Sequence, residues 1–188
     1  MYFEFSNPGK ILSGTYALEN IASELKLLKC SRAMILSDKV LNDIGSVKML
    51  SDALVTGGIK IASIYTDIPA DSDILVVNKI ANEYRKVNAD SIIALGGGSV
   101  IDTAKGLRML ISQGGNDILS FVGCEVLPKG QSVPLVAIPT TSGTGSEATQ
   151  IAVIKNNEKH VKMEFVSQFL LPDLAVIDPR FCTSMPKR

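Results

Sequence analysis

The chain has 188 residues, of which 46% are hydrophobic and 20% charged, and its formal net charge at pH 7 is zero because 19 Lys and Arg balance 19 Asp and Glu. This composition suits one or two globular domains with a sizeable core, and the lack of a positive bias argues against nucleic acid as a partner. No apolar stretch approaches the ~20 residues of a membrane span, and residues 1–10 show no secretory signal, so we expect a cytoplasmic protein with no membrane partner.

The start of the chain has a pattern that predicts a β-hairpin. Residues 2–5 and 10–12 have the composition of short strands, and the turn sequence Asn7-Pro8-Gly9 lies between them. Such a hairpin would cover one edge of a sheet, and it also favours association with further copies of the chain. We therefore expect a homo-oligomer.

The central part of the chain alternates between short buried strands and amphipathic helices. The predicted elements are strand 33–36, helix 41–55, strand 59–65, helix 73–87, strand 91–95, helix 100–112 and strand 134–138. Runs of four apolar residues suit strands buried on both faces, and apolar residues spaced as Val77, Ile80 and Tyr84 are typical of a helix. A further helical stripe starts at Leu18, and a further apolar run covers 174–177. This order predicts an α/β fold with a mainly parallel sheet flanked by helices.

Two regions depart from this alternation. Residues 113–133 are rich in Gly and show little periodicity, which predicts a long surface loop. Residues 148–154 and 160–166 flank a polar turn at 155–159 with two Asn residues at its centre, and this pattern predicts a second hairpin.

A glycine-rich turn lies between a predicted strand and a predicted helix. The sequence Gly-Gly-Gly-Ser at 96–99 directly follows strand 91–95. Glycines allow an anion to approach the backbone, and the N–H groups at a helix start attract negative charge, so a phosphate is a natural ligand. The spacing matches neither the usual dinucleotide fingerprint nor a P-loop. The alternative is structural: Ser99 caps the helix and Asp102 completes a capping box.

A second loop, at 139–147, follows strand 134–138 and carries five hydroxyl side chains and two glycines. Many short donors on a flexible backbone suit the oxygens of pyrophosphate and ribose. Both loops leave the carboxyl ends of parallel strands, where open α/β sheets bind ligands. The alternative is a loop rich in Ser and Thr that caps a helix starting near Ser146.

Asp38 lies just beyond strand 33–36. A carboxylate at such a strand end accepts hydrogen bonds from a ribose diol and repels a 2′-phosphate, which favours NAD over NADP. Capping of the following helix is the alternative role.

Other kinds of chemistry find little support. There is no G-x-S-x-G motif, and His160 is the only histidine, placed by the pattern on an exposed strand next to the hairpin turn. A Ser or Cys hydrolase and a metal site within this chain are therefore not expected.

Three blocks together resemble one known family. They are GGGSVIDTAK at 96–105, IPTTSGTGSE at 138–147 and LPDLAVIDP at 171–179. In order and spacing they resemble the iron-containing, or group III, alcohol dehydrogenases, and the resemblance runs over nearly the whole chain.

The resemblance implies a two-domain fold, in which a Rossmann-like α/β domain binds a nicotinamide cofactor and a C-terminal helical domain holds a divalent metal, iron or zinc. The family's metal ligands, one Asp and three His, are expected after the block that here ends at Met185-Pro186-Lys187-Arg188. We expect residues 1–188 to be the dinucleotide-binding domain, with the helical domain absent and no metal bound by this chain.

The resemblance also implies roles for particular residues. Asp38 would contact the adenine ribose. Lys162, on the second hairpin strand, would reach the cofactor as a cation. The alternative is a solvated strand lysine. The pyrophosphate region would be contacted by Gly97, Gly98, Ser99 and Asp102, and the phosphate and nicotinamide side would be lined by Thr140, Thr141, Thr144 and Ser146.

The implied reaction is reversible hydride transfer between a small alcohol or aldehyde and NAD, with the metal of the full-length proteins polarising the substrate oxygen. No residue of this chain is assigned a catalytic role, so we expect it to bind the cofactor without turnover on its own. Three alternatives stay open: a polyol dehydrogenase or dehydroquinate-synthase-like relative, a nucleotide-binding module without catalysis, and a flavodoxin-like domain for another anion.

Overall fold

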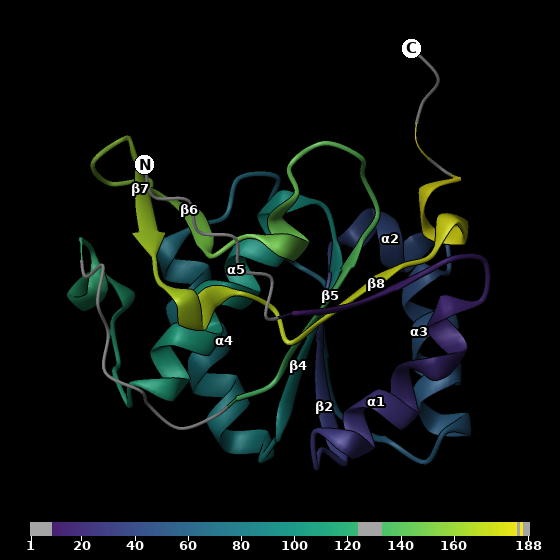
Figure 1. The fold of residues 1–188 in the computed structure, drawn as a ribbon. Helices are drawn as coiled ribbons and strands as arrows, with labels where there is room; N and C mark the ends of the chain where they lie inside the picture. Colours follow the sequence, from purple (N-terminus) through teal and green to yellow (C-terminus); the bar gives the residue numbers. More distant parts are fainter. Residues whose placement is uncertain (1–8, 124–132, 184, 186–188) are drawn as a thin grey trace, which may run out of the picture.

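The computed structural model describes residues 9–123, 133–183 and 185, and its main feature is a six-stranded sheet in which every neighbouring pair is parallel (Figure 1). The strands, in their order across the sheet, are β1 (Lys10–Ser13), β8 (Leu174–Ile177), β5 (Leu135–Pro139), β4 (Ser91–Gly96), β2 (Arg32–Leu36) and β3 (Lys60–Tyr65). The predicted parallel α/β sheet is confirmed, with strand ends that differ by at most one residue.

Helices cover both faces of this sheet. Figure 1 shows α1 (Ile21–Leu27) and α3 (Ser46–Thr56) on one side, and α4 (Ile74–Val87) and α5 (Gly98–Ser112) on the other. Each face has its own apolar cluster, because successive strand residues point to opposite faces: in β2, Ala33 belongs to one cluster and Met34 to the other. No helix in the described part of the chain is long and apolar enough to cross a membrane.

The predicted helix 41–55 is wrong as a single element. The structure has α2 (Lys39–Asp43) and α3, separated at Gly45, whose φ of 87° lies in the left-handed region that an α-helix does not use. Apolar periodicity could not reveal this break, because Leu41, Val47 and Leu50 are buried on either side of it.

The second predicted hairpin is confirmed. Strands β6 (Ile151–Asn156) and β7 (Val161–Val166) form a separate antiparallel pair that packs against α5. The helix considered near Ser146 is only one 3-10 turn, η3 (Ser146–Ala148). The remaining 3-10 turns are η1 (Ala17–Asn20), η2 (Ile118–Phe121), η4 (Gln168–Leu170) and η5 (Pro179–Cys182).

Two of the predicted segments lie only partly within the described residues. Of the expected N-terminal hairpin, the second strand exists as β1, which pairs in parallel with β8 at one sheet edge, whereas residues 2–5 lie outside the described residues. Of the loop predicted at 113–133, the first part contains η2, and residues 124–132 also lie outside the described residues.

Candidate functional site

Three loops that carry candidate residues leave neighbouring strands at the same edge of the sheet. Strand β4 lies between β2 and β5, so the loops after these strands start side by side. The backbone N–H of Thr140 donates to the carbonyl of Gly96 at 3.1 Å, which joins the second loop to the first. The sheet therefore brings Asp38, the glycine turn and the hydroxyl-rich loop together at the carboxyl edge.

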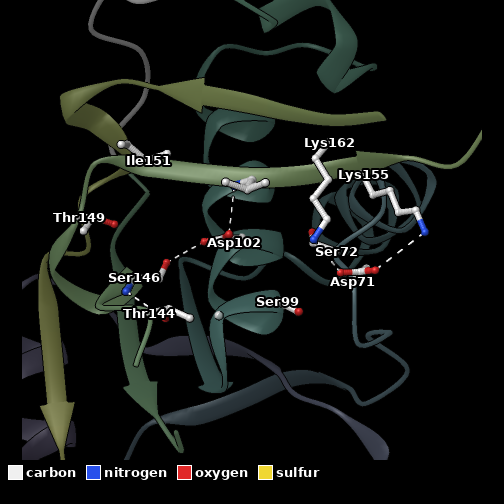
Figure 2. Close-up of a pocket in the computed structure, with 12 residues that line it drawn as sticks. Asp71, Ser72, Ser99, Asp102, Thr144, Ser146, Thr149, Ile151, Lys155 and Lys162 are labelled. Atoms are coloured by element: carbon white, nitrogen blue, oxygen red, sulfur yellow. Dashed lines mark hydrogen bonds and ion pairs between the residues drawn. The ribbon is translucent and has the colours of Figure 1, made fainter. Parts of the chain in front are cut away.

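Two pockets open at this edge. We call the first the α2 pocket; its volume is about 620 Å³ and its lining includes Asp38, Val40, Ile68, Pro69, Thr140 and Thr141. We call the second the hairpin pocket; its volume is about 420 Å³ and its lining includes Asp71, Ser72, Thr144, Ser146, Lys155 and Lys162 (Figure 2). Gly98 and Ser99 line both pockets, so the start of α5 stands at their junction.

The start of α5 is open towards a ligand. The N-cap residue is Gly97, which supplies no side-chain acceptor to the N–H groups of the first turn. A Cβ added at Gly98 would lie 2.9 Å from Cγ2 of Thr144, so glycine is needed for the close approach of the hydroxyl-rich loop. An anion at this point would meet unpaired N–H groups and the positive end of the helix dipole.

The capping-box alternative for Ser99 and Asp102 is wrong. The helix begins two residues earlier than expected, so Ser99 lies inside its first turn, and its hydroxyl donates to the carbonyl of Ala70. The carboxylate of Asp102 accepts from the hydroxyl of Ser146 at 2.7 Å and from the N–H of Val153 at 3.0 Å. Asp102 therefore ties α5 to the hydroxyl-rich loop and to β6 (Figure 2).

Lys105 supports the wall of the hairpin pocket from inside, a role that sequence reasoning missed. Its side chain is completely buried, and Nζ donates to Oγ1 of Thr149 at 3.1 Å and to the carbonyl of Ile151 at 2.7 Å. Burial lowers the pKa of Lys105 to about 8, and the nearby carboxylates of Asp102 and Glu147 oppose this shift. The available signal was its position one helical turn after Asp102, on the same side of α5.

Asp38 caps α2 and also borders the α2 pocket. Its Oδ1 accepts from the N–H of Leu41 at 2.9 Å, so the capping role is confirmed. Among the described residues no donor reaches Oδ2 of Asp38, which leaves one carboxylate oxygen for a ligand hydroxyl.

Lys162 is exposed on β7, but it is not simply a solvated lysine. Its Nζ lies 3.2 Å from Oδ1 of Asp71, and Nζ of Lys155 lies 3.9 Å from Oδ2 of the same carboxylate. Neither Asp71 nor Lys155 was singled out from the sequence, because their proximity to Lys162 arises only when the hairpin packs beside the loop that precedes α4.

The residues that the structure describes do not fit a divalent metal. Within residues 9–123, 133–183 and 185, no three His, Cys, Asp or Glu side chains lie together in a group that could hold a metal ion. His160 is exposed and lies in the hairpin turn with a φ of 53°, one residue before the strand on which the sequence pattern placed it.

A family model and individual relatives both point to the same protein family. The family model described as iron-containing alcohol dehydrogenase matches residues 8–179. A sulfoacetaldehyde reductase of Bilophila wadsworthia is 36% identical over 95% of this chain and 46% of its own length, and an NAD-dependent methanol dehydrogenase of Bacillus methanolicus is 30% identical over 97% of this chain and 47% of its own length.

Solved structures agree with this result. The sulfoacetaldehyde reductase of Bifidobacterium kashiwanohense, crystallised in complex with NAD+, matches with a TM-score of 0.90 at 27% identity, over 99% of this chain and 48% of that one. An alcohol dehydrogenase of Oenococcus oeni matches with a TM-score of 0.90 at 33% identity, over 98% and 48%. The chain thus spans about half the length of the relatives it matches.

Proposed function

The chain belongs to the iron-containing alcohol dehydrogenase family, and we propose that it binds NAD across the α2 pocket and the hairpin pocket. In this proposal it is the cofactor-binding part of an enzyme that transfers hydride reversibly between a small alcohol or aldehyde and the nicotinamide. NAD would supply the hydride chemistry, and the residues of this chain would bind and orient it.

The observation that carries the proposal is the position of Gly98 and Ser99 at the junction of the two pockets. A dinucleotide has two nucleoside ends and an anionic middle, so it needs two cavities joined by an anion site. The start of α5 provides backbone N–H groups at that junction, and the absence of a Cβ at Gly98 lets Thr144 of the hydroxyl-rich loop approach the same point.

The two pockets differ in a way that orients the ligand. The α2 pocket combines the carboxylate of Asp38 with the apolar side chains of Val40 and Ile68, which suits an adenine and its ribose diol. The hairpin pocket offers the hydroxyls of Thr144 and Ser146, which suits the diphosphate and the nicotinamide half. Thr140 and Thr141 line the α2 pocket and not the hairpin pocket, so we place them on the adenosine side and not on the phosphate and nicotinamide side that the resemblance implied.

Asp102 receives a different role from the one implied by the resemblance. Both of its oxygens accept hydrogen bonds from the protein, and a carboxylate would repel a diphosphate. We assign it as a positioning residue that holds Ser146 and β6 in place. Lys105 supports the same wall from inside, through Thr149 and Ile151.

We further propose that these 188 residues alone bind NAD without oxidising alcohols, as the absence of a metal-binding group among the described residues suggests. An assay of alcohol oxidation with the purified chain, with and without added Fe²⁺ or Zn²⁺, tests this point. Metal-dependent turnover would contradict it.

The test of binding is a fluorescence titration of the chain with NADH. We expect saturable binding that Gly98→Ala weakens roughly tenfold or more, or about 1.4 kcal/mol, because the added methyl group narrows the junction against Thr144. Gly143→Ala is the matched control, since Gly143 borders neither pocket and a Cβ there meets no atom of the described residues within 4 Å.

A wild-type chain that binds no NADH would overturn the proposal, as would Gly98→Ala binding like the wild type. Thermal unfolding of both variants shows whether a loss of binding at Gly98 reflects a loss of folding.

A further inference from the structure

Two lysines of the hairpin face each other across its strands beside the hairpin pocket. Lys155 on β6 and Lys162 on β7 are direct register partners in the antiparallel ladder, and both line the pocket. Like charges directly opposite each other on two strands destabilise the pair. This arrangement therefore gains stability when an anion lies between the two ammonium groups.

In the structure a carboxylate of the protein takes that place. The Nζ atoms of Lys162 and Lys155 lie 3.2 and 3.9 Å from different oxygens of Asp71, and Figure 2 shows both lysine side chains directed at it. Two positive charges and one negative charge leave this cluster with one positive charge. Because 53% of the Asp71 side chain is exposed, dissolved anions can reach the cluster.

The lysines do not hold the backbone of Asp71 in place; its neighbours do. The carbonyl of Ser72 accepts from the N–H of Lys155 at 2.7 Å, and the hydroxyls of Ser72 and Thr103 are 2.8 Å apart. On the other side the carbonyl of Ala70 accepts from the hydroxyl of Ser99. These contacts join the loop to both β6 and α5, so Asp71 stays beside the pocket when its lysines turn to another partner.

We propose that Lys155 and Lys162 form an oxyanion subsite of the hairpin pocket and that Asp71 is its resident counter-ion, from which a bound phosphate or sulfonate group takes over the two lysines. This inference deepens the proposed function and rests on it in one respect: the same pocket is assigned to the diphosphate and nicotinamide half of NAD. The group bound there is either a phosphate of the cofactor or an acidic group of the substrate.

If the subsite exists, substitutions of its lysines and of its aspartate should change anion affinity in opposite directions. The lysines attract the oxyanion, whereas Asp71 competes for the lysines and repels the ligand. Removing the charge of Asp71 should therefore tighten oxyanion binding, and removing that of Lys155 should weaken it. A role for Asp71 as a direct ligand of cofactor hydroxyls predicts the reverse for its variant.

The experiment is a set of calorimetric titrations of the 188-residue chain with NADH, inorganic pyrophosphate and 2-hydroxyethanesulfonate. Each ligand is titrated into the wild type, Asp71→Asn and Lys155→Gln. Lys159→Gln is the matched control, because Lys159 is exposed in the turn of the same hairpin and does not line the pocket.

For at least one of these anions, we expect Asp71→Asn to bind roughly twofold to fivefold more tightly than the wild type, and Lys155→Gln to bind more weakly by a similar factor. This range corresponds to the energies of exposed ion pairs. Both effects should shrink at high salt, and Lys159→Gln should match the wild type. The inference is overturned if Asp71→Asn binds equally or more weakly, or if Lys155→Gln behaves like Lys159→Gln.

The three ligands separate the possible sources and the two proposals. If the variants change the affinities of both pyrophosphate and NADH, the bound group is the diphosphate of the cofactor. If they change only the affinity of the sulfonate, the bound group is the acidic group of the substrate. If NADH binds but no variant changes any affinity, this inference fails and the proposed function stands. If the small anions respond but NADH does not bind, the proposed function fails and the subsite stands. If nothing binds, both fail.

Discussion

The two pockets on either side of Gly98 are built in different ways. The α2 pocket is formed by residues that directly follow strands of the main sheet, such as Asp38 after β2 and Thr140 after β5. The hairpin pocket has a wall from a separate two-stranded sheet, which α5 holds through Asp102 and Lys105. The first pocket follows from the parallel sheet itself, whereas the second depends on polar contacts between segments far apart in the chain.

The largest expected effect comes from breaking the hairpin wall. Asp102→Ala leaves the N–H of Val153 and the hydroxyl of Ser146 without their acceptor, so we expect the free energy of unfolding to fall by about 2–3 kcal/mol. Urea unfolding measures this change. Hydrogen exchange should show lost protection in β6, which belongs to the wall of the hairpin pocket. Protection in β2, which precedes the α2 pocket, should stay unchanged.

Asp52→Ala is the control for removing a carboxylate from a helix, because within the described part of the chain Asp52 pairs only with Lys48, and both side chains are exposed. Its effect should stay within about 0.5 kcal/mol. Equal effects of the two substitutions would mean that Asp102 does not hold the hairpin wall.

A smaller effect on the free energy of unfolding is expected from the titration of Lys105. Its pKa is about 8 in the folded chain and near the ordinary 10.5 in the unfolded chain, so between these pH values the unfolded state binds more protons. The free energy of unfolding therefore rises with pH between these two values, by at most about 1.4 kcal/mol per pH unit. Below pH 8 the buried ammonium group is charged, and its desolvation destabilises the fold to the full extent.

The measurement compares urea unfolding of the wild type and Lys105→Met at pH 7.5, 8.5 and 9.5. The stability of the wild type relative to the variant should increase along this series, because other titrating groups, such as the Cys30 thiol, are shared and cancel. A difference that stays constant with pH would show that Lys105 keeps an ordinary pKa despite its burial.

The smallest effect concerns the α2 pocket. Asp38→Asn keeps a side chain that caps helices as well as Asp does, so stability should change by only a few tenths of a kcal/mol. Loss of the negative charge should strengthen NADPH binding by about 1 kcal/mol, or roughly fivefold, and leave NADH binding less affected. Fluorescence titration with both cofactors measures this selectivity.

Asp43→Asn removes a charge from the same short helix outside the pocket, so it should leave the selectivity unchanged. Unaltered NADPH binding by Asp38→Asn would remove Asp38 from the proposed ribose contacts and leave it only as a helix cap.

Much of the fold could be predicted because it is encoded locally. The runs that became β2, β4 and β5 are apolar on both faces, and the helical stripe at 73–87 became α4 within one residue. The break at Gly45 could not be predicted, since the apolar spacing continues across it. The order of the strands, with β8 between β1 and β5, also has no local signal, because any buried apolar strand suits several positions.

The same division applies to the candidate site. The sequence by itself determined which loops follow parallel strands, and therefore that Asp38, Gly98 and Thr140 lie at the same edge of the sheet. Only the tertiary structure decided that Lys105 is buried under the hairpin and that Asp71 lies between two lysines. The physical reason is that residue periodicity reports which face of an element is buried, whereas the pairing of distant polar side chains depends on how whole elements pack together.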